Sequence, residues 1–155
     1  MAKEYWKPVN MLYPVPAVKV SCGREEETPN IVTVAWAGTI CSDPAMVSIS
    51  VRKERFSHDI IKDTGEFVIN LVNKKLVRAT DYCGVKSGRD VDKFAETRLT
   101  PQKSRYVKAP GIEESPVNIE CKVVEIKELG SHDMFIAKVM GVTIDNQYMD
   151  DRGKF

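Results

Sequence analysis

The sequence predicts a mainly β protein, an antiparallel barrel with short helical insertions. About six segments alternate apolar and polar side chains with a period of two, as strands do, and only two or three short segments have helical signals. Strands and helices do not alternate regularly, so a closed antiparallel barrel fits better than a doubly wound parallel sheet. At 155 residues, the chain is long enough for one domain with its own core.

The first three strands are expected over Val15–Cys22, Asn30–Ile40 and Ala45–Arg52. Prolines precede the first strand and a charged loop follows it, which separates it from the second. The second and third strands are joined by a short turn that contains Asp43-Pro44, so they are expected to form a hairpin. A register that pairs even-numbered with odd-numbered positions would place the apolar sides of both strands on one core.

One face of this hairpin is expected to carry small or hydroxylated side chains, which is unusual for a solvated strand face. The apolar face holds Val32, Val34, Trp36, Ile40, Val47, Ile49 and Val51. The opposite face holds Thr33, Ala35, Ala37, Thr39, Ser48, Ser50 and Arg52. Such a face indicates either a flat ligand against the backbone or a close-packed seam with another sheet or subunit. The residues of this segment leave both alternatives open.

The next segment is expected to be a helix over Phe56–Gly65, capped by Ser57, stapled by Phe56 and Ile61, and ended by Gly65. The remaining elements are a strand over Glu66–Leu71, a helix over Lys74–Tyr82, a glycine-containing loop over Cys83–Arg89, a helix over Asp90–Glu96, an irregular stretch over Leu99–Pro116, and a hairpin of two long strands over Val117–Leu129 and Met134–Ile144.

The composition argues against several classes of function. Charged residues make up 29% of the chain and nearly cancel, with a formal net charge of +1, so no broad field attracts nucleic acid or anionic lipid. Apolar runs are too short to cross a bilayer and the N-terminus lacks a signal-peptide core, so the cytoplasm is the expected compartment. The four cysteines have no C-x-x-C spacing, which argues against a zinc or iron–sulfur site.

The sharpest chemical pattern is Ser50-x-Arg52 at a strand end, followed by the helix start at Ser57-His58. The free N–H groups of a helix start favour an anion, and an arginine beside them adds a charged donor, so the pattern predicts a phosphate site. The alternative is that Arg52 only pairs with a carboxylate such as Asp59.

A second basic loop, Lys86–Arg89 with Lys93 beyond it, is placed to close over the same phosphate, although such loops are often plain solvated turns. The chain has no G-x-G-x-x-G fingerprint, phosphate-binding loop or G-x-S-x-G elbow, so a dinucleotide fold, a nucleotide hydrolase and a serine hydrolase are not supported. On the residues alone, His132 is interpreted as a surface histidine in a hairpin turn.

Together these segments resemble the flavin reductase-like family of FMN-binding split barrels. The resemblance is carried, in order and spacing, by NIVTVAWAG at 30–38, SDP at 42–44, VSISVR at 47–52, FSH at 56–58, GEFVIN at 65–70 and SGRDVDKF at 87–94. It covers nearly the whole chain and is more specific than any one motif.

The resemblance implies a Greek-key split β-barrel as a single domain over residues 1–155, a homodimer, and FMN bound without a covalent link. The implied cofactor-binding residues are Thr33, Ala35, Trp36, Ala37, Gly38 and Thr39 for the isoalloxazine, Ser50, Val51, Arg52, Ser57 and His58 for the phosphate region, and Ser87 and Lys93 for the tail. His132 matches a polar position near the flavin or nicotinamide and is the candidate catalytic residue. Members usually continue past the point that matches Asp150–Phe155, so the wall of the site is expected to lack a C-terminal segment.

The leading hypothesis is an NAD(P)H-dependent flavin oxidoreductase that passes electrons from FMN to a small-molecule or protein acceptor. The cofactor carries this chemistry, so few protein groups need be catalytic. The alternative is a flavoredoxin-like electron carrier that keeps its FMN and turns over NAD(P)H poorly. A third hypothesis is a barrel that binds another ligand or none, with its small-residue face serving only as a dimer seam.

Overall fold

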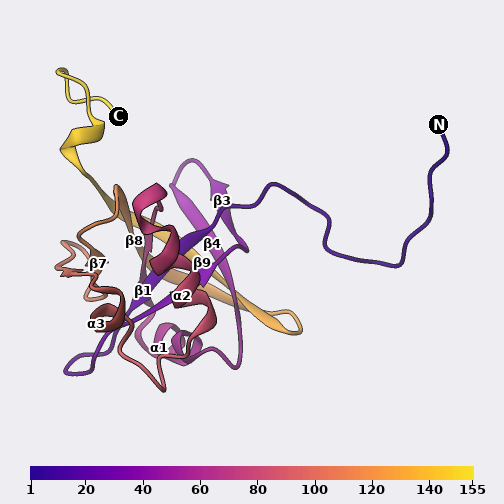
Figure 1. Ribbon diagram of the computed structural model, residues 1–155, viewed down its shortest axis with the longest axis horizontal. Helices are drawn as coiled ribbons and strands as arrows, with labels where there is room; N and C mark the ends of the chain where they lie inside the picture. The colour runs from indigo at the N-terminus through magenta and orange to yellow at the C-terminus, as the bar shows by residue number, and fades with distance from the viewer.

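The computed structural model describes residues 1–155 and is the expected mainly β fold, a split barrel (Figure 1). Seven strands form one antiparallel sheet in the order β2-β1-β5-β8-β9-β4-β3, and β6 and β7 pair separately. The strands are β1 (Val18–Cys22), β2 (Asn30–Val34), β3 (Ala37–Cys41), β4 (Met46–Arg52), β5 (Glu66–Asn70), β6 (Pro101–Gln102), β7 (Gly111–Ile112), β8 (Val117–Glu128) and β9 (His132–Ile144). The helices are α1 (Phe56–Thr64), α2 (Val77–Val85) and α3 (Lys93–Thr97), with 3-10 turns η1 (Lys74–Leu76) and η2 (Asn146–Tyr148).

The chain bends at Ala35–Trp36, so the one strand expected over Asn30–Ile40 is in fact two. β2 pairs with β1 at one edge of the sheet, and β3 pairs with β4 at the other. The Ser50 N–H donates to the Trp36 carbonyl over 2.8 Å and ties the bend to β4. A corner of this kind lets one segment serve both edges and curls the sheet into a barrel.

The β3–β4 hairpin forms, but the expected register is wrong. Ala37 pairs with Ile49, so odd-numbered positions face each other along most of the hairpin. As a result Ala37 packs against the barrel core, while Trp36 and Ile40 are exposed. The bend reverses which positions point inward, so the expected apolar face ends at Val34.

Two apolar clusters lie on opposite faces of the β1–β2 part of the sheet. The barrel interior holds Val18, Val20, Cys22, Val32, Val34, Val47, Ile49, Val51, Ile60, Ile61, Phe67, Ile69, Cys121, Phe135 and Ala137. The second cluster, which includes residues of α2, α3 and β7, holds Ile31, Leu76, Cys83, Phe94, Leu99 and Ile112. Because both faces of β1 are covered, all five of its residues are buried, including Lys19.

Helix α1 begins differently from the expectation and ends as expected. Its N-cap is Arg55, whose side chain makes no capping bond, and Ser57 lies inside the first turn, where its hydroxyl accepts from the Asn30 amide over 2.8 Å. The predicted cap and staple are therefore wrong, because both need Phe56 to precede the helix. Gly65 ends the helix at φ 68°, with its N–H bonded to the Ile61 carbonyl.

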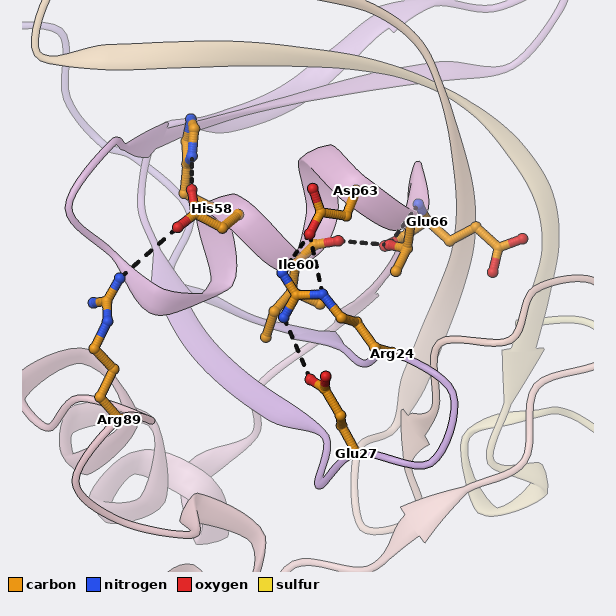
Figure 2. A network of polar contacts seen from close by, with 9 residues as sticks. Arg24, Glu27, His58, Ile60, Asp63, Glu66 and Arg89 are labelled. Atoms are coloured by element: carbon orange, nitrogen blue, oxygen red, sulfur yellow. Dashed lines mark hydrogen bonds and ion pairs between the residues drawn. The ribbon is translucent and has the colours of Figure 1, made fainter.

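The far end of α1 is tied to the loop between β1 and β2 (Figure 2). The Arg24 Nε donates to Asp63 over 3.1 Å, and the same guanidinium lies 3.4 Å from Glu27. The Thr64 hydroxyl donates to the Ile60 carbonyl over 2.8 Å. The Arg24 contacts tie this end of α1 to the β1–β2 loop, and the other end of α1 faces the cleft described below.

The other elements follow the sequence closely. The helix expected from Lys74 is η1 followed by α2, the last helix is α3 with Asp92 as its N-cap, and the stretch over Leu99–Pro116 is irregular apart from two short strands. The two long strands expected near the C-terminus form the hairpin of β8 and β9. No helix of the structure has the length and apolar character needed to cross a membrane.

The first residues of the chain form an extended arm that runs away from the barrel (Figure 1). Residues 1–14 are all exposed and contain no helix or strand. The arm carries large apolar side chains, among them Tyr5, Trp6, Met11 and Leu12.

Candidate functional site

Two neighbouring hollows on one side of the barrel form a single two-ended cleft. One has a volume of about 440 Å³ and lies at the start of α1, and the other has a volume of about 380 Å³ and lies along β2 and the end of β4. Val32, Arg52 and Arg55 line both hollows and join them. We call the first hollow the basic end and the second the flat end.

The basic end is built from the start of α1 and the loop after α2. Arg52 ends β4, Arg55 caps α1, and Lys86 follows α2, while Glu54 is the one carboxylate in the lining. The Arg55 guanidinium donates to the Gly84 carbonyl over 3.1 Å, and Arg52 lies 3.4 Å from Glu54 at the surface. Because the first N–H groups of a helix have no partner within it, this end favours an anion.

Gly88 brings the loop after α2 against α1. A Cβ at this position would lie 2.2 Å from the Asn30 side-chain oxygen and 2.7 Å from the Phe56 ring. Asn30 is buried and bonded to Ser57, so it has little freedom to move aside. The close approach therefore needs glycine at position 88.

We expect Gly88→Ala to open the basic end by pushing this loop away from α1. Overpacking of this kind costs about 1 to 3 kcal/mol. An anionic ligand that needs the loop against α1 must meet this cost on binding, so its affinity should fall by roughly 5- to 150-fold. Gly130→Ala is the matched control, because its methyl group meets open space. Ligand titration of both variants checks this, and equal affinity would show that the loop does not shape the site.

The flat end is lined by strand residues of β2 and β4 and by residues of the bend, with larger side chains such as Trp36 and His132 among them. Thr33, Val34, Ala35 and Trp36 come from the end of β2 and the bend, and Ser50 and Val51 come from β4, with Ser131, His132 and Asn10 at the rim. The Thr33 hydroxyl donates to the Thr80 carbonyl on α2, so it is directed away from the cleft. A planar group can lie here close to the strand backbone.

His132 stands at the rim of the flat end, opposite Arg52 in the β4–β9 ladder. Partial burial lowers the pKa of His132, and the positive charge of Arg52 lowers it further. Its Nδ1 lies 2.7 Å from the Ser131 hydroxyl. At neutral pH the imidazole is therefore uncharged and suited to hydrogen bonding beside a bound ring.

Most of the residues expected from the sequence meet in this cleft, but their side chains are not all available to a ligand. Ser87 lines the basic end. Lys93 also lines it, yet its ammonium group is buried and donates to the carbonyls of Ile31 and Cys83 over 2.6 and 2.7 Å. Ser57 lines it as well, with a buried hydroxyl that accepts from Asn30.

Four expected residues lie outside the cleft. The His58 side chain is directed into the protein, where it contacts Asp133, and it lines neither hollow. Ala37, Gly38 and Thr39 lie on β3 beyond the bend and line neither hollow. In this single chain the bend therefore separates the two halves of the expected Thr33–Thr39 surface.

Comparison with known proteins identifies the family of this chain. The family model described as flavin reductase like domain matches residues 11–155. The chain belongs to the flavin reductase-like family.

Solved structures with the same fold include two flavoredoxins. The flavoredoxin of Desulfovibrio vulgaris (Miyazaki F) is 35% identical with a TM-score of 0.90, and the match covers 99% of this chain and 82% of that one. A flavoredoxin from Methanosarcina acetivorans is 26% identical with a TM-score of 0.88, over 99% and 81% of the two chains. A protein of Archaeoglobus fulgidus with no described function is 30% identical over 152 residues, 98% of this chain and 85% of its own length.

Several cleft residues of this flavin reductase-like chain were not predicted from its sequence. They are Asn10, Asn30, Glu54 and Arg55. Arg55 had a usable signal, because a second arginine stands directly before the predicted helix. Nothing in the sequence marks Asn10, because only the course of the N-terminal arm brings it to the flat end.

Proposed function

We propose that this protein binds FMN in the two-ended cleft and carries electrons, as the flavoredoxin name implies for its relatives. The observation that carries the proposal is the joining of a basic hollow at a helix start to a second hollow along the β2 and β4 strands through Arg52 and Arg55. A flavin mononucleotide has the same two parts, one anionic phosphate and one planar ring system.

The residues present fit this group. At the basic end, Arg52, Arg55 and Lys86 would hold the phosphate together with the first N–H groups of α1. At the flat end, the backbone at Ala35, Trp36 and Val51 would lie close to the ring. When bound, FMN supplies hydride acceptance and electron transfer, while the protein supplies orientation and electrostatics.

We favour electron carriage over NAD(P)H oxidation because of the two flavoredoxins described above. They are 35% and 26% identical to this chain, and each match covers 99% of it. The electron acceptor on this proposal is a second redox protein or a small molecule.

The purified protein, loaded with FMN, tests the proposal by its colour and its bleaching. We expect retained yellow flavin absorption that is bleached anaerobically by dithionite or a reduced redox protein, and only slowly by NADH or NADPH. Rapid bleaching by a nicotinamide would show an NAD(P)H:flavin oxidoreductase instead. A protein that stays colourless with added FMN would contradict both.

We also propose that the protein is a homodimer in which each N-terminal arm lies on the other copy. The arm exposes three aromatic side chains, Tyr5, Trp6 and Tyr13, alongside Met11 and Leu12. Aromatic residues bury about 150 to 250 Å² each, so docking the arms supplies much of the roughly 800 Å² per partner that stable dimers bury.

A hollow at the base of the arm supports the proposal that a second copy of the chain docks there. An apolar hollow of about 640 Å³ lies between the arm and the bend, lined by Val9, Asn10, Met11, Leu12, Val15, Ala35, Trp36 and Ala37. This hollow adjoins the flat end, since Asn10, Ala35 and Trp36 line both. A two-fold pair of chains would cover both hollows at once.

Deleting residues 2–12 should convert a dimer of about twice 17.4 kDa into a monomer, measured by light scattering after size exclusion. Tyr148→Ser is the control, because Tyr148 is an exposed aromatic near the other terminus. A monomeric full-length protein, or a truncated protein that still dimerises, would rule out docking through the arm.

A further inference from the structure

We propose that the buried His58–Asp133 pair is a positioning device that holds the two ends of the cleft at the spacing FMN needs. The inference rests on the proposed FMN site and assigns a role to two residues that do not touch the ligand. It makes His58 important for flavin binding through its contact inside the protein rather than through the phosphate.

The pair is short and enclosed. The His58 Nε2 donates to an Asp133 carboxylate oxygen over 2.7 Å, and the two residues are only 4% and 1% exposed. The imidazole also meets the Phe135 ring edge-on, with 5.4 Å between ring centroids. A hydrogen bond to a charged group in such surroundings resists separation more than a surface ion pair does.

Each partner is attached to a different end of the cleft. His58 lies in the first turn of α1, directly after Phe56 and Ser57, which line the basic end. Asp133 directly follows His132, which lines the rim of the flat end. This is the only side-chain hydrogen bond between α1 and β9, and it adds a direct tie to the β4–β9 backbone ladder, in which Arg52 pairs with His132.

The electrostatics favour a charged carboxylate in this pair. Burial alone would raise the pKa of Asp133, but the hydrogen bond from His58 and the charge of Lys53 lower it below its usual value. The Lys53 ammonium lies 3.4 Å from the second carboxylate oxygen. Removing the imidazole would therefore leave a buried carboxylate with one exposed partner, and the hairpin turn would move to reach water.

The other ring nitrogen extends the connection to the loop after α2. The His58 Nδ1 lies 3.1 Å from Asp59, and Asp59 lies 4.0 Å from Arg89. Figure 2 labels His58 and Arg89, the two ends of this series of contacts. The Arg89 guanidinium donates to the Glu54 carbonyl over 2.9 Å and stacks over Phe56 at 5.3 Å. His58 is thus the centre of a set of contacts that reaches the loop at the basic end as well as the turn at the flat end.

Comparing FMN with riboflavin isolates this role, because riboflavin has the ring but no phosphate. If the pair sets the spacing, His58→Leu should weaken FMN binding by about tenfold or more and riboflavin binding by less than about threefold, since only FMN must fit both ends. Asp133→Asn keeps the shape and an oxygen that can accept from His58, so it should keep most of the preference for FMN.

Asp63→Asn is the matched control, because it breaks the exposed ion pair at the other end of the same helix. It should lower thermal stability without changing the ratio of the FMN and riboflavin dissociation constants. If His58→Leu leaves the ratio of the FMN and riboflavin dissociation constants unchanged, the positioning role is overturned. A wild-type protein that binds neither flavin would instead contradict the proposed function.

Discussion

The Arg52→Ala variant is expected to bind FMN about 10- to 150-fold more weakly than the wild type. Arg52 lines both ends of the cleft and is half exposed, with Glu54 as its only ion-pair partner, so its guanidinium is free to turn toward a phosphate. A hydrogen bond to a charged group contributes about 1.5 to 3 kcal/mol, which corresponds to this loss of affinity. Titration of FMN fluorescence at fixed salt measures it.

Arg78→Ala is the matched control, since Arg78 is an exposed arginine on α2 that lines neither end of the cleft. It should leave FMN affinity within about twofold. If Arg52→Ala also stays within twofold, the phosphate does not lie at the junction of the two hollows, and the assignment of the basic end is wrong.

The Lys19→Met variant is expected to be more stable than the wild type by about 2 kcal/mol near pH 7, because it removes a buried donor with no partner. Lys19 is fully buried on β1, and its ammonium nitrogen makes no hydrogen bond. Burial lowers the pKa of Lys19 to about 8, although Cys83 and Glu114 partly oppose this. Chemical denaturation of both proteins measures the difference.

The pH dependence gives a second signature of Lys19. The folded-state pKa lies below the unfolded value of about 10.4, so between about pH 8 and pH 10 the unfolded state binds more protons than the folded state. The free energy of unfolding should therefore rise with pH across this window in the wild type. Lys19→Met should lose this contribution.

Lys93→Met is the control that separates the effect of burying a lysine from the effect of its hydrogen bonds on stability. Burial also lowers the pKa of Lys93, but its ammonium group donates to two carbonyls. Removing it leaves those carbonyls unpaired, so Lys93→Met should destabilise the fold while Lys19→Met stabilises it. The same sign for both variants would show that partners do not decide the cost of these lysines.

The sequence is sufficient to predict most elements of this fold, because side-chain period and turn residues act locally. Gly65 ends α1 where expected, and the β8–β9 hairpin follows the two long alternating segments. The bend at Ala35–Trp36 escapes such reasoning, since both neighbouring strands keep β-type residues and only closure of the barrel requires a corner. The wrong β3–β4 register follows from that missed corner.

The site is predictable where it depends on residues close in sequence. Arg52 and Ser57 lie in one short segment, and both line the basic end. His58 shows the limit of this reasoning, because its partner Asp133 is 75 residues away and turns the imidazole into the protein. A pattern at a helix start does not show which side chains point outward once a distant strand supplies a carboxylate.

Parallel titration of the wild-type protein with FMN and with riboflavin tests the central claim most directly. If the phosphate is held at the basic end, FMN should bind at least about tenfold more tightly, and added salt should narrow the gap because it screens the contact with the phosphate. Equal affinities at low salt, or no binding of either flavin, would contradict a phosphate held by Arg52, Arg55 and the start of α1.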